Sequence, residues 1–367
     1  MSSASHPTDS LNVNAYIHQA GAELGMTFCV DGSTHRLLDD YSNNLRAAIK
    51  LVVYIFIQYR PNLREYELDG LIGNLKLCRY LPSPDRDFVA VIDVLLRNLL
   101  ASNFDHLIAM MADRKRMEIF FADLCERVRH EGEHIQAITR AIDRERESYA
   151  KKQAVKHTVE AALASDAPVE MYKIAFLRKQ FMPANREAAL SEYERARSND
   201  ALFRQQMSGE PVSRQPNTLL RPGVGVIQRD LTALKDYLER AVWVKEILRG
   251  GIITVDFSCI HGLYLTAALA ADGRMESALE GLTGELFHQW DELTNGDGHI
   301  HHWDESQCSW SGSIESTDAA KRMALLLEFE GRAMREKYVR SKDSESLPTF
   351  TLIEPFASVQ RKDDRNA

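Results

Sequence analysis

A heptad pattern of large apolar side chains between Met117 and Tyr149 is the feature that most constrains how this chain folds. The spacing alternates between four and three residues over more than four heptads, which is typical of a coiled coil. The pattern positions are Met117, Phe121, Leu124, Val128, Glu131, Ile135, Ile138, Ile142, Glu145 and Tyr149. The intervening residues are densely charged, as on the solvated faces of such a helix. We therefore predict a long coiled coil or helical hairpin.

An apolar seam of this length needs a partner helix, because its stripe would otherwise remain exposed to water. The partner is expected in the same chain, in a second copy or in another protein. Glu131 and Glu145 occupy seam positions, where acidic side chains fix the register or mark where the seam opens. The sequence therefore predicts an oligomer or an intramolecular helix pair.

Apolar periodicity elsewhere predicts further helices and one clear strand. Helices are expected at about residues 37–59, 65–78, from 85 onward, in two segments between the seam and residue 197, from about 230 to 249, 274–293 and 318–339. The strand is expected at residues 252–257, where β-branched side chains follow two glycines. The predicted fold class is mainly α, with a smaller C-terminal α+β module.

Glycine and proline divide the chain into segments. We expect a disordered lead over 1–36, a helical array with the coiled coil over 37–207, a linker over 208–226, an α+β module over 227–342 and a loose tail over 343–367.

Charge and cysteine content exclude several classes of function. The 45 basic and 53 acidic residues give a formal charge of −8, which opposes binding to nucleic acid. The longest apolar run, residues 51–57, is far shorter than the ~20 residues that span a bilayer. The five cysteines form no C-x-x-C pair, as expected for free thiols in a reducing compartment. The sequence predicts a cytoplasmic protein without a membrane anchor.

Two short patterns suggest metal chemistry on helices. His130, Glu131 and His134 match H-E-x-x-H, in which two histidines one turn apart bind zinc and the glutamate activates water. The spacing of Glu131 and His134 recurs at Glu285 and His288, as in the paired ligands of di-iron bundles. Exposed histidines beside a seam glutamate are the structural alternative, and His288 is expected to face solvent.

A third pattern lies on an expected strand. His299 and His301 alternate, which places both imidazoles on one face, where they can hold a divalent cation. This element resembles the His-hydrophobic-His motif of rolling-circle replication nucleases, over at most the last ~120 residues. The resemblance implies a metal that polarises the scissile phosphate and a nucleophilic tyrosine, here Tyr338, with residues 252–257 and Glu292 nearby. A histidine-rich surface turn and a core tyrosine are the alternatives.

The heptads favour an interaction, scaffolding or regulatory protein without catalytic activity. Its helical array would contact a protein partner or a second copy, and it would need no cofactor. The alternatives are a metal-dependent nuclease of the His-hydrophobic-His type that cuts single-stranded DNA, using His299, His301 and Tyr338, or a zinc or di-iron enzyme using His130, Glu131 and His134. Both alternatives require a divalent metal ion.

Overall fold

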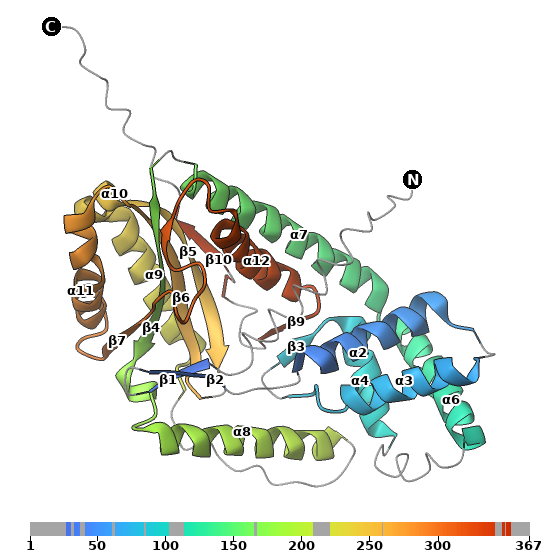
Figure 1. The fold of residues 1–367 in the computed structure, drawn as a ribbon. Helices are drawn as coiled ribbons and strands as arrows, with labels where there is room; N and C mark the ends of the chain where they lie inside the picture. The colour runs from blue at the N-terminus through green and yellow to red at the C-terminus, as the bar shows by residue number, and fades with distance from the viewer. Residues whose placement is uncertain are drawn as a thin grey trace, which may run out of the picture.

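The chain is mainly helical, with an α+β part built around one antiparallel sheet (Figure 1). A computed structural model describes residues 27–30, 33–36, 41–60, 63–83, 86–102, 114–164, 167–207, 221–258, 260–341, 347–348 and 350–353. Most of the expected lead, linker and tail therefore lies outside the described residues. None of the described helices combines the length and apolar character that a bilayer span requires.

The central sheet has six strands, and every pair in it is antiparallel. They are β4 (Val169–Arg178), β5 (Leu248–Ser258), β6 (Gly262–Asp272), β7 (Gly298–Trp303), β8 (Gly312–Ile314) and β10 (Phe350–Ile353). The order is β10-β5-β6-β4-β7, and β8 also pairs with β4. The strand expected at residues 252–257 is confirmed as part of β5.

Helices cover both faces of this sheet (Figure 1). One face carries α9 (Val224–Arg240), α10 (Val242–Ile247) and α11 (Glu276–Leu293). The other carries the C-terminal half of α7 (Ala137–Ala162) and α12 (Ala319–Arg335). Alternate residues of each strand face opposite sides, so Phe176 meets Trp290 of α11 while Ala175 and Leu177 face α12.

The N-terminal helices form a second core beside the sheet. This bundle contains α2 (Tyr41–Val53), the π-helix η1 (Tyr54–Gln58), α3 (Glu65–Cys78), α4 (Ala90–Ala101) and α6 (Arg114–His134). The short ribbon of β3 (Arg86–Phe88) and β9 (Val339–Ser341) joins the bundle to the chain that follows α12. The remaining elements are β1 (Thr27–Val30), β2 (Ser33–Arg36), the 3-10 turn η3 (Lys179–Phe181) and α8 (Arg186–Met207).

The expected unbroken seam is wrong, because the helix stops in its middle. Helix α6 ends at His134, and Gln136 adopts a left-handed backbone conformation with φ of 54° before α7 begins. Among the seam residues of α6, Phe121, Leu124 and Val128 are buried in the bundle core. In α7, Ile138, Ile142 and Tyr149 keep between 43% and 48% of their surface exposed.

Helix α7 does lie along another helix, but through a different face. Its partner is α12, which runs antiparallel to it and forms ion pairs between Lys151 and Glu336 at 2.5 Å and between Lys152 and Glu330 at 3.1 Å. The buried residues of α7 include Ala137, Ser148 and Val155, whose row lies one residue before the expected seam. One residue is about 100° around a helix, so small side chains mark the buried face and larger ones flank it.

A second expectation is also wrong. Two helices were expected between the heptads and residue 197, yet Val169–Arg178 is β4, which pairs with β6, β7 and β8. A segment of the stretch that was expected to be helical, Val169–Arg178, therefore forms a strand in the interior of the sheet. The described end of the expected linker, residues 221–223, leads directly into α9 at Val224.

Candidate functional site

The H-E-x-x-H segment lies at the end of α6, where its glutamate has a structural role. His130 and His134 are exposed, while Glu131 is half-buried between α6 and α4. One Glu131 oxygen accepts a hydrogen bond from Asn98 Nδ2 at 2.5 Å, and the other lies 2.7 Å from Arg97 Nη1. Both carboxylate oxygens are therefore engaged in joining the two helices.

The glycine inside this segment also has a packing role. A Cβ placed on Gly132 would lie 2.7 Å from both Cε1 and Cζ of the Phe56 ring. Real side chains do not approach so closely, so glycine is the residue that lets η1 pack onto α6. The pattern H-E-G-E-H is thus explained here by helix packing.

The Glu285 and His288 pair is not brought near the α6 pair. Both side chains are exposed on α11, as expected, and His288 Nε2 lies 3.3 Å from Glu292 Oε1 on the same helix. Within the described ranges, no three histidine, cysteine, aspartate or glutamate side chains converge as a metal site would require.

His299 and His301 share one face of β7, opposite Leu177 and Ala175 of β4. The ring of His301 is buried edge-on to Trp303, with 4.8 Å between ring centroids. Burial lowers the pKa of His301 to about 4, and burial together with Lys179 lowers the pKa of His299. Both imidazoles are therefore neutral at pH 7.

The other residues implied by the nuclease resemblance lie elsewhere. Tyr338 follows α12 and packs against the bundle core, and its carbonyl accepts the amide proton of Val89 at 2.9 Å. Burial raises the pKa of Tyr338, which disfavours the phenolate. Glu292 lies on α11, which covers the opposite sheet face from His299. The structure joins the two histidines to each other but not to Tyr338 or Glu292.

A buried ion network on the α12 face was not predicted from the sequence. Arg332 Nη1 lies 2.6 Å and 2.8 Å from the two carboxylate oxygens of Asp256 and donates to Thr254 Oγ1 at 3.0 Å. Burial alone would raise the pKa of Asp256, but Arg332 and Thr266 hold it below its ordinary value. An aspartate within the apolar strand β5 was the local signal for this network.

The same network continues through Glu328. One of its oxygens lies 2.7 Å from Lys173 Nζ and 3.2 Å from Arg332 Nη2, and the other accepts from Trp310 Nε1 at 2.5 Å. Both oxygens are therefore occupied by protein donors. The network ties α12 to β4 and β5 and leaves these carboxylates engaged with protein groups.

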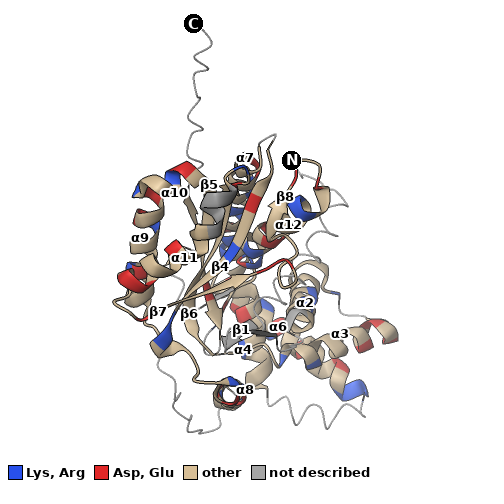
Figure 2. Cartoon of the chain, turned by 60° about the vertical axis from the view of Figure 1, so that its left-hand side comes forward, with Lys and Arg blue, Asp and Glu red and all other residues tan. Residues whose placement is uncertain are grey.

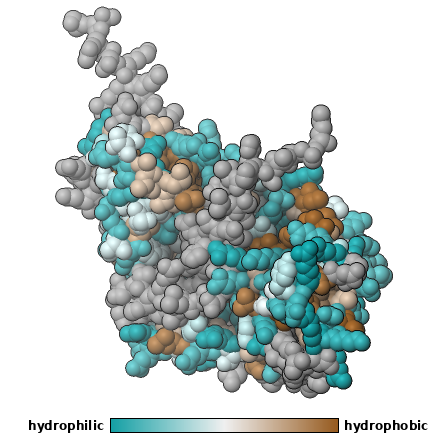
Figure 3. All heavy atoms as spheres, turned by 45° about the vertical axis from the view of Figure 1, so that its right-hand side comes forward, coloured by the Kyte–Doolittle hydropathy of each residue, from teal (hydrophilic) through white to brown (hydrophobic). Residues whose placement is uncertain are grey.

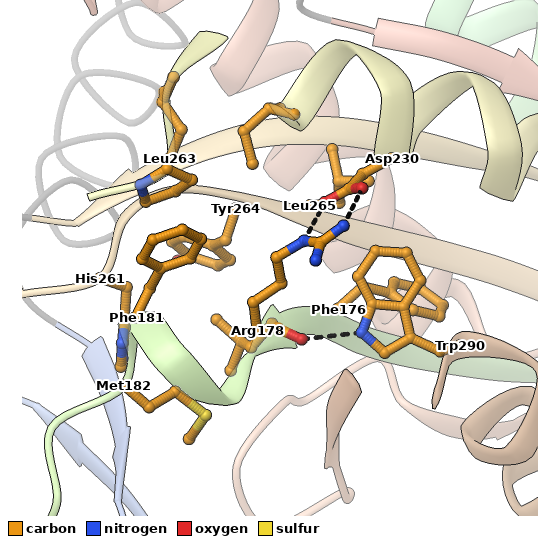
Figure 4. Close-up of a pocket in the computed structure, with 13 residues that line it drawn as sticks. Phe176, Arg178, Phe181, Met182, Asp230, His261, Leu263, Tyr264, Leu265 and Trp290 are labelled. Carbon is orange, nitrogen blue, oxygen red and sulfur yellow. Dashed lines mark hydrogen bonds and ion pairs between the residues drawn. The ribbon is translucent and has the colours of Figure 1, made fainter. Parts of the chain in front are cut away.

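A small pocket lies where β4 ends in η3 (Figure 4). Arg178 and Asp230 form a two-bond ion pair there at 2.8 Å and 2.6 Å, and Trp290 donates to the Leu177 carbonyl at 2.8 Å. The free volume of about 10 Å³ is at the lower limit for one water molecule. This pocket is too small for an organic substrate.

A large hollow lies between α4, α7 and α8. Its volume of about 660 Å³ falls within the range of known ligand sites. We call it the α4–α7–α8 groove, and it is lined by Pro82, Ser83, Arg86, Asp87, Phe88, Val89, Ala90, Asp93, Leu96, Arg97, Ile135, Arg140, Asp143, Arg144, Glu147, Phe203 and Met207. Its surface combines apolar side chains with charges of both signs.

Most groove charges have partners within the protein. Arg144 binds Asp87 at 3.0 Å, Arg97 binds Asp93 at 2.9 Å, and Asp143 lies 3.4 Å from Arg146. Arg140 and Glu147 are exposed on α7, and among the described residues neither forms an ion pair.

Nothing in the heptad analysis pointed to this groove. The signal was present in the α7 residues that line the groove, where the charged residues Arg140 and Glu147 are seven positions apart.

Comparison of the chain with protein-family models, curated proteins and solved structures finds no match.

Proposed function

We propose that this chain is a cytoplasmic, non-catalytic interaction protein whose helical array binds another polypeptide. The observation that carries the proposal is the α4–α7–α8 groove, which is wide, open and lined by both apolar and charged side chains. The candidate catalytic side chains lie apart or bind other protein groups. Cys78, Cys125 and Cys308 are free and buried, which fits a reducing compartment.

The weak anchoring of α8 supports this proposal. Helix α8 has 22 residues, of which Ala189 and Glu192 are buried. Helices in proteins gain most of their stability from packing one face against a core. Figure 1 shows α8 along the lower edge of the molecule, where it forms one wall of the groove. A bound segment would supply the packing that α8 otherwise lacks.

The rest of the surface gives less support to other partners. Figure 2 shows acidic and basic residues interspersed along the helices, and the net charge of −8 repels polyanions. Figure 3 shows apolar side chains in separate spots among hydrophilic ones on the face it presents. The α4–α7–α8 groove combines apolar area and charge in one concave surface.

Site-specific photocrosslinking in the source cells tests this function. A photoreactive phenylalanine analogue replaces Phe203 in the groove, and the same analogue at exposed Phe287 on α11 serves as the control. We expect a discrete crosslinked species from position 203 and not from position 287. Absence of any crosslink at 203, or equal crosslinking at both positions, would contradict an interaction function centred on the groove.

A second candidate function, divalent metal binding, is favoured by the shared face of His299 and His301. Two neutral imidazoles on alternate strand positions carry the nitrogen donors that zinc, copper and nickel bind. Metal analysis after equilibration with zinc, followed by gel filtration, is the test. Stoichiometric zinc that is lost in a His299→Ala/His301→Ala variant and retained in His130→Ala/His134→Ala would support this function. Zinc content unaffected by the first variant would exclude it.

A further inference from the structure

We propose that the α4–α7–α8 groove binds an amphipathic helix of a partner protein. The partner helix carries an acidic residue opposite Arg140 and a basic residue seven positions away, opposite Glu147. This partner chemistry rests on the proposed interaction function and adds the features by which the groove selects its ligand.

The charge argument comes from two exposed α7 residues, Arg140 and Glu147, which form no ion pair within the described part of the chain. Arg140 and Glu147 are seven residues apart, so they lie on one side of α7 at a separation of about 10.5 Å along its axis. Residues seven apart on a partner helix share one face with the same separation. An acid and a base at that spacing match both groove charges at once, and the apolar side chains between them fix the direction in which the partner runs.

The apolar residues of the groove fit the apolar face of such a partner helix. Helices α7 and α8 both pack on α4, so α4 forms the floor between two helical walls. Leu96 comes from this floor, Ile135 from the turn before α7, and Phe203 and Met207 from α8. Phe203 and Met207 are four residues apart and therefore lie on one side of α8. Partner side chains at three- and four-residue spacing would fill the groove in the helix-in-groove mode.

The charge balance argues against an anionic ligand. The groove contains four arginines, Arg86, Arg97, Arg140 and Arg144, and four carboxylates, Asp87, Asp93, Asp143 and Glu147. The two sets cancel, so a phosphate backbone would gain little net attraction. A helix with charges of both signs gains from Arg140 and Glu147 together.

The test is a selection from a displayed library of helical peptides with randomised faces. The library is selected on the wild-type protein and counter-selected on Arg140→Glu/Glu147→Arg. We expect enriched peptides to carry an acid and a base seven residues apart, with apolar residues between them. Affinity for the double variant should fall roughly tenfold, because two exposed attractions become two repulsions. A peptide with its two charges exchanged should regain affinity for the double variant.

The control variant is Lys156→Glu/Glu160→Lys, which reverses an exposed charge pair of α7 that does not line the groove. It should leave peptide affinity within about twofold, and thermal unfolding should show that both variants remain folded. Enriched peptides without the charge pair, or equal binding to wild type and to the groove variant, would overturn the inference. So would single-stranded DNA or a second copy of this chain displacing all selected peptides. If photocrosslinking at Phe203 still succeeds in that case, the interaction function stands and only the partner chemistry fails.

Discussion

Replacing Gly132 with alanine tests whether the H-E-G-E-H segment is a packing motif. In a free helix this change stabilises by about 1 kcal/mol, because glycine has the greater conformational freedom when unfolded. Here the new Cβ would lie 2.7 Å from two carbons of the Phe56 ring. The ring must move by roughly 1 Å, and overpacking of this kind costs about 1–3 kcal/mol. We expect a net destabilisation of about 1 kcal/mol.

Gly284→Ala in α11 is the matched control, because nothing lies within 4 Å of its added Cβ. That variant should be more stable than wild type by about 0.5–1 kcal/mol. Urea denaturation followed by circular dichroism measures both changes as shifts of the midpoint at constant slope. Adding Phe56→Leu to Gly132→Ala should recover part of the loss, which shows that the two sites are coupled. Stabilisation by Gly132→Ala equal to that of Gly284→Ala would refute the packing explanation.

Two further predictions concern buried charges and histidines. Arg332→Met should destabilise the protein by about 3–5 kcal/mol in urea unfolding, because it removes the guanidinium that is bonded to the buried Asp256 carboxylate. The exposed Arg146→Met should change stability by under ~0.5 kcal/mol, and similar effects for both variants would contradict the network. Burial lowers the pKa of His261 and His301 to about 4, below the value of about 6.5 in the unfolded chain. The unfolded chain therefore binds more protons between pH 6.5 and 4, so stability should fall as the pH falls through this window. Urea midpoints at pH 7 and 4.5 measure the change, which His261→Gln should reduce, and an unchanged midpoint difference in that variant would be evidence against a neutral buried His261.

The sequence predicted the buried side of α6 correctly but not that of α7. In α6 the large apolar residues, such as Phe121 and Leu124, are also the buried ones. In α7 the buried positions include two small residues, Ala137, which packs in the bundle core, and Ser148, which lies in the stretch that runs along α12. Periodicity of large side chains therefore identified a flank of α7 as its seam, because size was taken as the sign of burial. Only the position of α12 distinguishes the two faces.

At the candidate sites too, the sequence predicted local geometry but not contacts between distant segments. Local spacing correctly placed His299 and His301 on one strand face, because alternation is a local property of strands. The partners of Glu131 and Asp256 depend on contacts between segments distant in sequence, which no spacing rule gives. The Gly132 contact with Phe56 spans 76 positions and likewise requires the packed bundle.

Hydrogen exchange of α8 and α7 tests the central claim most directly. We expect the backbone amides of α8 to exchange much faster than those of α7 in the free protein, because α8 buries so little of its surface. Adding a helical peptide selected on the groove should slow exchange in α8 and leave the β5–β6 hairpin unchanged. Slow exchange of α8 in the free protein, or no added protection when the peptide binds, would contradict a groove that is completed by a partner helix.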